Sequence, residues 1–422
     1  MPSPRLLLLG VVLFGTACEP TVTPPNPTRM MVLLKDPDGV LRPNQVELTT
    51  LTRPAALEGT AGFLIGGARI EVDPSDPLVQ NARTYEQLRD ALVKDEGRPV
   101  KAEFFDQAGV LWPADFHTWN MATAYYHLER SAQYFRDTGA VPESALDKAR
   151  VYYFPKVHFH DEGPDPMVDN AMWYSLVQSL FVLPFDALQT EPLSINAGVM
   201  THEFSHRVFN RLVHRGAPMP AAINAWSSTV GSTPGLNVLD ALDEGFADFH
   251  AVASSCRSRF GCDTRFMSTS FDPEVADNRD LAAPRCMSAA LANALYTAGR
   301  EEFGGVGRQY AVGTLIASAL WEAAESTGQR ESLEQALLDA YSDENLSNPG
   351  LAQVLELTLP DQTAFTLGLA MSVVVSHISD PTLKLAACSS LADRLGLQFG
   401  SGYGQLMCPD NAVRGTTCEV LP

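Results

Sequence analysis

The sequence predicts an α+β fold in which strands dominate the N-terminal part and helices the C-terminal part. Short alternating apolar segments, MMVLLKD and GFLIGGARIEVD, occur early in the chain and are typical of strands. From Asn237 onward apolar residues recur mostly with helical spacing. With 45% hydrophobic and 19% charged residues, a chain of 422 residues can bury substantial cores. The net charge of −20 disfavours nucleic acid and anionic membrane surfaces as partners.

The first 18 residues have the features of a lipoprotein-type signal peptide. Arg5 precedes the apolar run LLLLGVVLF, which is too short to span a bilayer as a mature helix, and GTAC ends at Cys18. Because the segment before Cys18 resembles a bacterial lipobox, we expect a lipid anchor on Cys18; cleavage near Ala17 is the alternative. The protein is thus expected to be exported, either to a bacterial cell envelope as a lipoprotein or by secretion. Residues 19–30 are rich in Pro and Thr and are predicted to form an extended tether.

Two further segments precede the most informative motif. Residues 31–110 combine short strands with the helical pattern TYEQLRDALVKD and are predicted to form a small α+β module. In residues 111–215 we expect a helix from about Thr118 to Asp137, then strands in VYYFPKVHFH and around Asn170. Since His158 and His160 are two residues apart, they share one strand face. They are expected either to bind a second metal ion or to belong to a polar strand face.

The pentapeptide HEFSH contains His202, Glu203 and His206 on a helix predicted from Ile195 to His214, with Ser194 as its N-cap. Residues four apart on a helix project from one face, so the two imidazoles can share a zinc ion. Glu203 then lies beside the metal without being a ligand, where a carboxylate can accept a proton from water. The helix also carries a stripe of apolar residues (Met200, Phe204, Val208 and Leu212), which favours burial. The alternative is a core helix with hydrogen-bonded histidines.

The segment DALDEGFADFHA supplies a candidate third ligand, 38 residues after His206. Asp240, Glu244 and Asp248 recur every fourth residue, and such stacked carboxylates weaken a helix unless a cation offsets them. We therefore expect Glu244 to complete the zinc site, one ion per chain, and Asp248 to orient one of the imidazoles. An exposed acidic helix face is the alternative.

HEFSHRVFNR and LDEGFADFHA together resemble the gluzincin zinc metallopeptidases, close to the fungalysin and thermolysin-like groups. The resemblance covers about residues 115–322. It implies that His202, His206 and Glu244 bind zinc, that Glu203 is the general base and that Asp248 supports the site. It also implies a two-lobed thermolysin-like fold, with zinc between a β-rich N-lobe and a mostly helical C-lobe. Residues 31–110 would then be a propeptide-like module or part of the N-lobe.

The resemblance extends to other segments and departs at two positions. VDNAMWYSLVQSLFVLPFD is similar to the active-site edge strand of the family, which implies that Asn170 and Ala171 bind the substrate backbone. In YAVGTLIASALWEAAES, Tyr310 stands where relatives carry an oxyanion-stabilising His, and Thr314 replaces a Glu. A phenol can donate a hydrogen bond to an oxyanion, so Tyr310 is a catalytic candidate. The Gly/Pro/Ser-rich segment RGAPMPAAINAWSSTVGSTPG reads as an inserted loop near the site.

The remaining chain divides into a helical C-lobe, 216–380, and a disulfide-bearing segment, 381–422. Six cysteines besides Cys18 suit an oxidising compartment, and six cysteines allow fifteen connectivities. Short spacing favours Cys256–Cys262 and Cys408–Cys418, which leaves Cys286–Cys388 by elimination. Members of the family bind calcium, but the acidic segments 73–77 and 161–166 do not match an EF-hand loop and are expected to be solvated turns.

The leading functional hypothesis is a zinc-dependent endopeptidase that acts on proteins or peptides through a zinc-activated water and a Glu base. Three alternatives stay open. A catalytically weak or inactive envelope lipoprotein could use the same fold as a binding or scaffold protein, as Tyr310 and Thr314 suggest. A structural envelope protein could contain HEFSH by chance. An aminopeptidase is less favoured, since no motif for capturing a free amino terminus is evident.

Overall fold

The computed structural model describes residues 27–36, 39–160, 163, 165–186, 191–216, 234–257, 262–266, 279–304, 307–359, 361–415 and 418–421. The predicted signal peptide, Cys18 and the predicted tether up to residue 26 lie outside these ranges. The predicted inserted loop also lies outside them at residues 217–233. Within the described residues, no helix is both long enough and apolar enough to cross a membrane.

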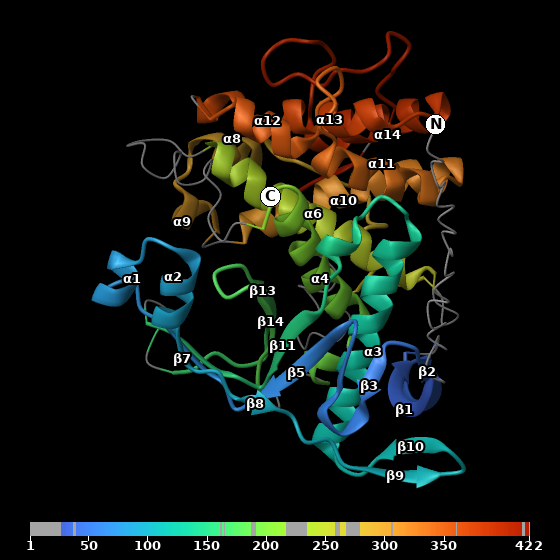
Figure 1. The fold of residues 1–422 in the computed structure, drawn as a ribbon. Coiled ribbons are helices and arrows are strands. Elements are labelled where there is room, and N and C mark those ends of the chain that lie inside the picture. The colour runs from blue at the N-terminus through green and yellow to red at the C-terminus, as the bar shows by residue number, and fades with distance from the viewer. Residues whose placement is uncertain are drawn as a thin grey trace, which may run out of the picture.

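Strands dominate the chain up to residue 182, and helices dominate it from residue 197, so the predicted α+β class is confirmed. In Figure 1 the sheets lie at one end of the molecule, the C-terminal helices at the other, and α4 and α6 between them. One four-stranded sheet has the order β2-β1-β10-β9. Its strands are β1 (Thr28–Lys35), β2 (Leu41–Leu48), β9 (Phe104–Gln107) and β10 (Val110–Pro113).

The largest sheet has the order β13-β14-β11-β5-β4-β3, with β8 paired to β5. Its strands are β3 (Leu51–Arg53), β4 (Glu58–Gly59), β5 (Gly62–Gly66), β8 (Arg98–Pro99), β11 (Ala149–Tyr153), β13 (Ala171–Tyr174) and β14 (Ser179–Val182). A third sheet, β12-β6-β7, consists of β6 (Arg69–Val72), β7 (Val93–Asp95) and β12 (Lys156–Phe159). The second and third sheets combine strands from before and after residue 110, and strand β10 of the first sheet begins at that residue. A cut at that position would leave β11 without its parallel partner β5.

The described helices are α1 (Pro77–Asn81), α2 (Tyr85–Leu92), α3 (Phe116–Asp137), α4 (Ala197–Leu212), α6 (Pro234–Ser255), α8 (Ala289–Thr297), α9 (Arg300–Gly304), α10 (Arg308–Thr327), α11 (Arg330–Ser342), α12 (Leu351–Leu357), α13 (Leu367–His377) and α14 (Pro381–Leu395). Helix α6 packs against α4 on one side and α10 on the other, and α10 also packs against α14. Helix α3 contacts both β1 and α4, so it links the sheets to the helices. Most of the buried apolar residues of α3, α4, α6 and α10 belong to one continuous core.

The helix that carries HEFSH starts later than the sequence predicts. Ser194 lies in a short 3-10 turn, Leu193–Ile195, and is not the N-cap. The cap is Asn196, whose Oδ1 accepts a hydrogen bond from the backbone N–H of Val199 at 3.1 Å. Asn is as effective an N-cap as Ser, so sequence preference alone does not decide between them.

The disulfide prediction is correct for Cys256–Cys262 and wrong for the other two pairs. The structure pairs Cys286 with Cys418 and Cys388 with Cys408. The reason is a parallel strand pair, β15 (Arg285–Cys286) with β16 (Glu419–Val420), which brings the end of the chain alongside Cys286. Short spacing in the sequence favoured Cys408 as the partner of Cys418, whereas the pairing of β15 with β16 places Cys418 beside Cys286.

Candidate metal centre

Helix α4 carries His202, Glu203 and His206. His202 and Glu203 are buried, and His206 is partly buried. The Nε2 atoms of His202 and His206 lie 3.0 Å apart. This closeness follows from the four-residue spacing, which places both rings on the same side of the helix. Three ligand-type atoms, one from each of the three residues, lie within 4.8 Å of one another and form a group that could hold a metal ion.

Helix α6 brings Glu244 to the same point. Its Oε2 lies 3.3 Å from Nε2 of His202 and 3.9 Å from Nε2 of His206. Two imidazole nitrogens and one carboxylate oxygen therefore converge from two helices. The predicted ligand set is brought together by the packing of α6 against α4, although the sequence separates its members by up to 42 residues.

Two more carboxylates contact the outer nitrogens of the histidines. Asp248, fully buried, places Oδ1 3.0 Å from Nδ1 of His202. Asp243 Oδ1 lies 2.8 Å from Nδ1 of His206. The hydrogen bond with Asp243 favours the His206 tautomer that carries its proton on Nδ1, which leaves the Nε2 lone pair of that ring directed toward His202. The sequence reasoning missed Asp243; its only signal was its position next to Glu244.

This arrangement fits a zinc ion. The two nitrogens at 3.0 Å, with a carboxylate oxygen beside them, repel one another unless a proton or a metal ion lies between them. A tetrahedral zinc ion with bonds of about 2.0–2.1 Å holds its ligand atoms about 3.3–3.4 Å apart. The three separations between these atoms, 3.0, 3.3 and 3.9 Å, bracket that value. The mixed nitrogen and oxygen donor set also matches the preference of zinc.

The electrostatic field of the centre favours positive charge. Burial alone would lower the pKa of His206, but the charge of Asp243 and its hydrogen bond raise that pKa to about 10. Burial opposes ionisation of Glu244, yet its contacts with His202 and His206 lower its pKa to about 2. The carboxylates therefore stabilise a cation among them.

Glu203 differs from Asp243, Glu244 and Asp248 because, among the described residues, its carboxylate forms no ion pair with His202 or His206. Burial raises its pKa, against the opposing effect of the nearby histidines. Its Oε2 accepts a hydrogen bond from the backbone N–H of Trp173 at 2.6 Å. Trp173 belongs to β13, which is an edge strand of the largest sheet. The Glu203 carboxylate of α4 is thus hydrogen-bonded to a strand that lies at the edge of this sheet among the described strands.

Arg279 is a second residue that sequence reasoning missed. Its guanidinium forms ion pairs with Asp248 and, at 3.4 Å, with Glu244. It also lies over the rings of Phe266 and Tyr310, at 5.2 and 4.9 Å from their centroids. The pKa of Arg279 is raised because the two carboxylates outweigh the effect of burial. No local pattern around Arg279 marks it, since its partners are 31 to 35 residues away.

Helix α10 supplies Thr314, Gly313 and Tyr310. Thr314 donates a hydrogen bond from Oγ1 to Oδ2 of Asp248 at 2.9 Å, so it supports a carboxylate that contacts His202. Tyr310 lies beside Arg279 and is 40% exposed. Its pKa is raised to about 12, chiefly by the negative charge of Glu244 and by burial. The phenol is therefore protonated at neutral pH and can donate a hydrogen bond.

Asn170 and Ala171 lie at the start of β13. Asn170 is exposed, and its Oδ1 accepts a hydrogen bond from the N–H of Ala171 at 2.8 Å. Strand β13 pairs with β14 on one side only. On its other side, the backbone N–H of Trp173 is directed toward α4, where it donates to Glu203. The role of both residues in substrate binding stays a prediction.

Comparison with known proteins gives little further information. No protein-family model matches the chain, and no curated protein matches it. Among solved structures, it is similar to the precursor of protealysin, a metalloproteinase from Serratia proteamaculans. The TM-score is 0.44, the sequence identity is 15%, and the match covers 79% of this chain and 87% of that chain. We therefore base the proposed function on the geometry of the metal centre and not on this similarity.

Proposed function

We propose that the protein is a zinc-dependent endopeptidase. The observation that carries this proposal is the convergence of two imidazole nitrogens and the Glu244 carboxylate oxygen, with a carboxylate oxygen of Glu203 also within 4.8 Å of the two nitrogens. A structural zinc site is closed by four protein ligands, whereas a hydrolytic site keeps one position free for water. His202, His206 and Glu244 supply three ligands, so the set is that of a hydrolytic site.

The catalytic step needs a base, and Glu203 fits that role. Zinc, when bound, supplies a Lewis acid that polarises the scissile carbonyl and lowers the pKa of a water molecule to about 7. The Glu203 carboxylate accepts the proton from the attacking water and later transfers it to the leaving amine. The hydrogen bond from the N–H of Trp173 fixes one carboxylate oxygen and leaves the other oxygen for the water.

The substrate backbone is proposed to bind along the free edge of β13, near Asn170 and Ala171. An extended peptide can add to such an edge as a further strand, so its main chain is held next to Glu203. Tyr310 is proposed to donate its phenolic proton to the oxyanion that develops at the scissile carbonyl. The negative charge of Glu244 and burial raise the pKa of Tyr310 to about 12 and keep it protonated, against the opposing charge of Arg279.

Export is part of the same proposal. Three disulfides connect the six cysteines after Cys18, and such pairing is typical of proteins in oxidising compartments. A signal peptide at 1–18 and a lipid on Cys18 would place the enzyme at the cell envelope; cleavage before Cys18 would instead release it by secretion. Protein or peptide substrates outside the cytoplasm are the expected partners.

The test compares peptide cleavage by the parent chain and by Glu203→Gln, each loaded with zinc. The Gln side chain keeps the volume and the acceptor for Trp173 but cannot take up a proton. We expect cleavage of a denatured protein substrate by the parent and a loss of at least about 100-fold in kcat for Glu203→Gln, the typical lower size of a general-base contribution. Glu143→Gln is the matched control, because Glu143 is an exposed residue whose side chain pairs with Arg136.

Three outcomes are informative. Cleavage by the parent and the control but not by Glu203→Gln supports the endopeptidase. Zinc bound at one equivalent in the centre, without cleavage by any variant, would instead favour the binding or scaffold protein. Equal cleavage by the parent and Glu203→Gln would show that Glu203 is not the base.

A further inference from the structure

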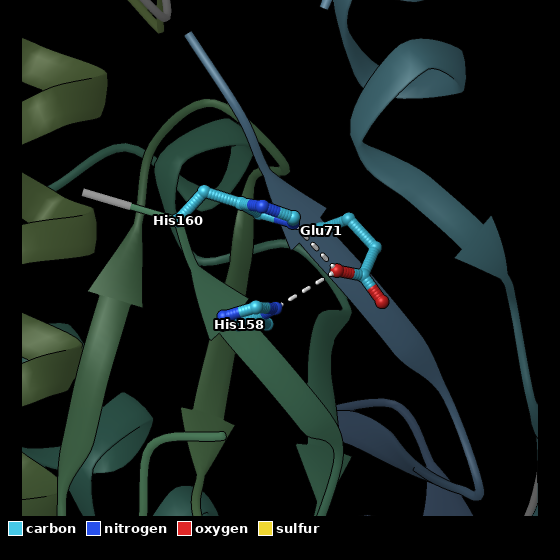
Figure 2. Close-up of side chains that lie close together, drawn as sticks. All are labelled: Glu71, His158 and His160. Carbon is cyan, nitrogen blue, oxygen red and sulfur yellow. Dashed lines mark hydrogen bonds and ion pairs between the residues drawn. The ribbon is translucent and has the colours of Figure 1, made fainter. Parts of the chain in front are cut away.

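A second cluster of metal-ligand residues lies on a different sheet from the edge strand β13. The cluster consists of Glu71 on β6, His158 on β12 and His160, which directly follows β12. Their side chains lie together on one face of the sheet β12-β6-β7 (Figure 2). One ligand-type atom from each residue lies within 4.8 Å of the other two. Glu71 Oε2 is 3.3 Å from Nδ1 of His158 and 3.0 Å from Nε2 of His160.

Strand register produces this cluster. Strands β6 and β12 are parallel, and His158 is directly opposite Glu71. Backbone pairing continues past the strand ends, where the N–H of His160 donates to the carbonyl of Val72 at 3.0 Å. Side chains two residues apart on a strand share a face, so His158 and His160 lie on the same side as Glu71. The opposite face is buried: Ile70 and Val157 are fully inaccessible.

The hydrogen bonds of His158 determine which nitrogen faces Glu71. Nε2 lies 2.8 Å from the carbonyl oxygen of Gly163, an acceptor that requires a proton on Nε2. In the neutral ring, Nδ1 then carries a lone pair and faces the carboxylate oxygen of Glu71 at 3.3 Å. Two acceptors at that separation need a cation beside them, either a proton or a metal ion. A histidine whose outer N–H donates to a backbone carbonyl is also the usual arrangement of a metal ligand.

We propose that Glu71, His158 and His160 form a second metal site, specific for a divalent transition ion of the zinc class. Two imidazoles and a carboxylate suit zinc, copper or nickel, whereas calcium and magnesium require oxygen ligands. Both nitrogen-to-oxygen separations are close to the distance of about 3.3–3.4 Å between ligands of one tetrahedral zinc ion. Three protein ligands leave a position for water, and the 42% exposure of the His160 side chain opens that position to solvent.

The consequence is structural. Glu71 and the two histidines are 87 to 89 residues apart in the sequence, so one ion would cross-link β6 to β12. An ion that binds only the folded chain stabilises it by mass action. This second site uses none of the ligands of the centre on α4 and α6, and the inference does not depend on peptidase activity.

The experiment measures zinc stoichiometry in the full chain by equilibrium dialysis and elemental analysis. The parent is expected to bind two equivalents. Glu71→Gln, His158→Asn and His160→Asn are each expected to bind one, and His206→Asn, which disrupts the centre on α4, is also expected to bind one. His206→Asn combined with Glu71→Gln should bind none. His377→Asn is the matched control, because His377 lies on α13 beside Asp343 and should keep two equivalents.

A melting experiment gives a second readout that does not depend on the centre. Zinc should raise the melting temperature of His206→Asn, and the added Glu71→Gln substitution should abolish that rise. If His158→Asn does not fold, Glu71→Gln and His160→Asn still test the site, since their side chains are partly exposed. Equal zinc content in the parent and all three variants, or a zinc-independent melting temperature in His206→Asn, would overturn the proposal and leave a protonated His–Glu ion pair.

Discussion

Helices α6 and α10 cross at two glycines, and an alanine at Gly245 should disturb both the fold and the metal centre. A Cβ atom added at Gly245 would lie 2.5 Å from the carbonyl oxygen of Gly313 and 3.0 Å from its Cα. Ordinary contacts of a Cβ begin at 3.4 Å, so the helices must separate by about 0.9 Å at this point. The contacting atoms are backbone, and a side-chain rotation cannot relieve the clash.

The expected magnitude combines two opposing effects. Overpacking of a close contact costs about 1–3 kcal/mol of the free energy of unfolding. Alanine recovers up to about 1 kcal/mol through its better helix propensity. We therefore expect Gly245→Ala to lower the free energy of unfolding by about 1–2 kcal/mol. Because Glu244 is the preceding residue, its carboxylate moves with the helix, and a displacement near 1 Å costs about 100-fold in activity.

Urea unfolding of the zinc-free protein measures the first effect, and zinc competition with a chelator, together with peptide cleavage, measures the second. Gly299→Ala is the control, since a Cβ at Gly299 meets no atom within 4 Å. Its free energy of unfolding should change by no more than about 0.5 kcal/mol. If Gly245→Ala matches the parent in stability and in zinc affinity, the two helices do not approach as closely as the structure shows, and the reasoning is refuted.

Three other predictions concern separate parts of the molecule. Asp243→Ala removes the partner of His206 Nδ1 and should weaken zinc binding by about 10–100-fold in the chelator competition. Burial lowers the pKa of His250 from about 6.5 in the unfolded chain to about 3 in the folded protein. The unfolded chain therefore binds a proton first as the pH falls, so the free energy of unfolding is unaffected above about pH 6.5 and decreases between about pH 6.5 and pH 3. Between pH 7 and pH 5 the parent should therefore lose about 2 kcal/mol more stability than His250→Gln in urea unfolding. Glu129→Ala leaves the backbone N–H groups of Thr49 and Thr50 without their acceptor and should cost about 3 kcal/mol in the same assay.

Each of these predictions has its own control. Asp240→Ala changes an acidic residue on the same helix that pairs with Arg300, so equal zinc affinities of the Asp240 and Asp243 variants would contradict the orienting role. Parallel stability curves for the parent and His250→Gln would show that the buried imidazole does not titrate between folded and unfolded states. Glu129→Gln keeps one carbonyl acceptor and should lose less stability than Glu129→Ala; the reverse order would contradict the hydrogen-bond argument.

The sequence by itself determined the local features of this protein. Helical and alternating apolar patterns predicted helices in the regions of α2, α3, α4 and α6 and strands in the regions of β1, β5, β6, β11 and β12, since such periodicity depends only on which face is buried. It did not reveal α12 and α13; α13 lies in an apolar segment without a clear polar face. The four-residue spacing placed His202 and His206 on one helix face, and the same spacing placed Glu244 and Asp248 on another.

Tertiary structure alone decided the contacts between distant segments. Helix packing selected Asp243, Arg279 and Thr314 as neighbours of the centre, and the parallel register of β6 and β12 placed Glu71 opposite His158. Strand pairing at the chain end likewise selected the partner of Cys286. The physical reason is the same in each case. The periodicity of apolar residues specifies which face of a helix or strand is buried. Which residues that face contacts depends on the strand register and on the crossing of helices that are far apart in the chain. A local sequence pattern carries no information about that register or crossing.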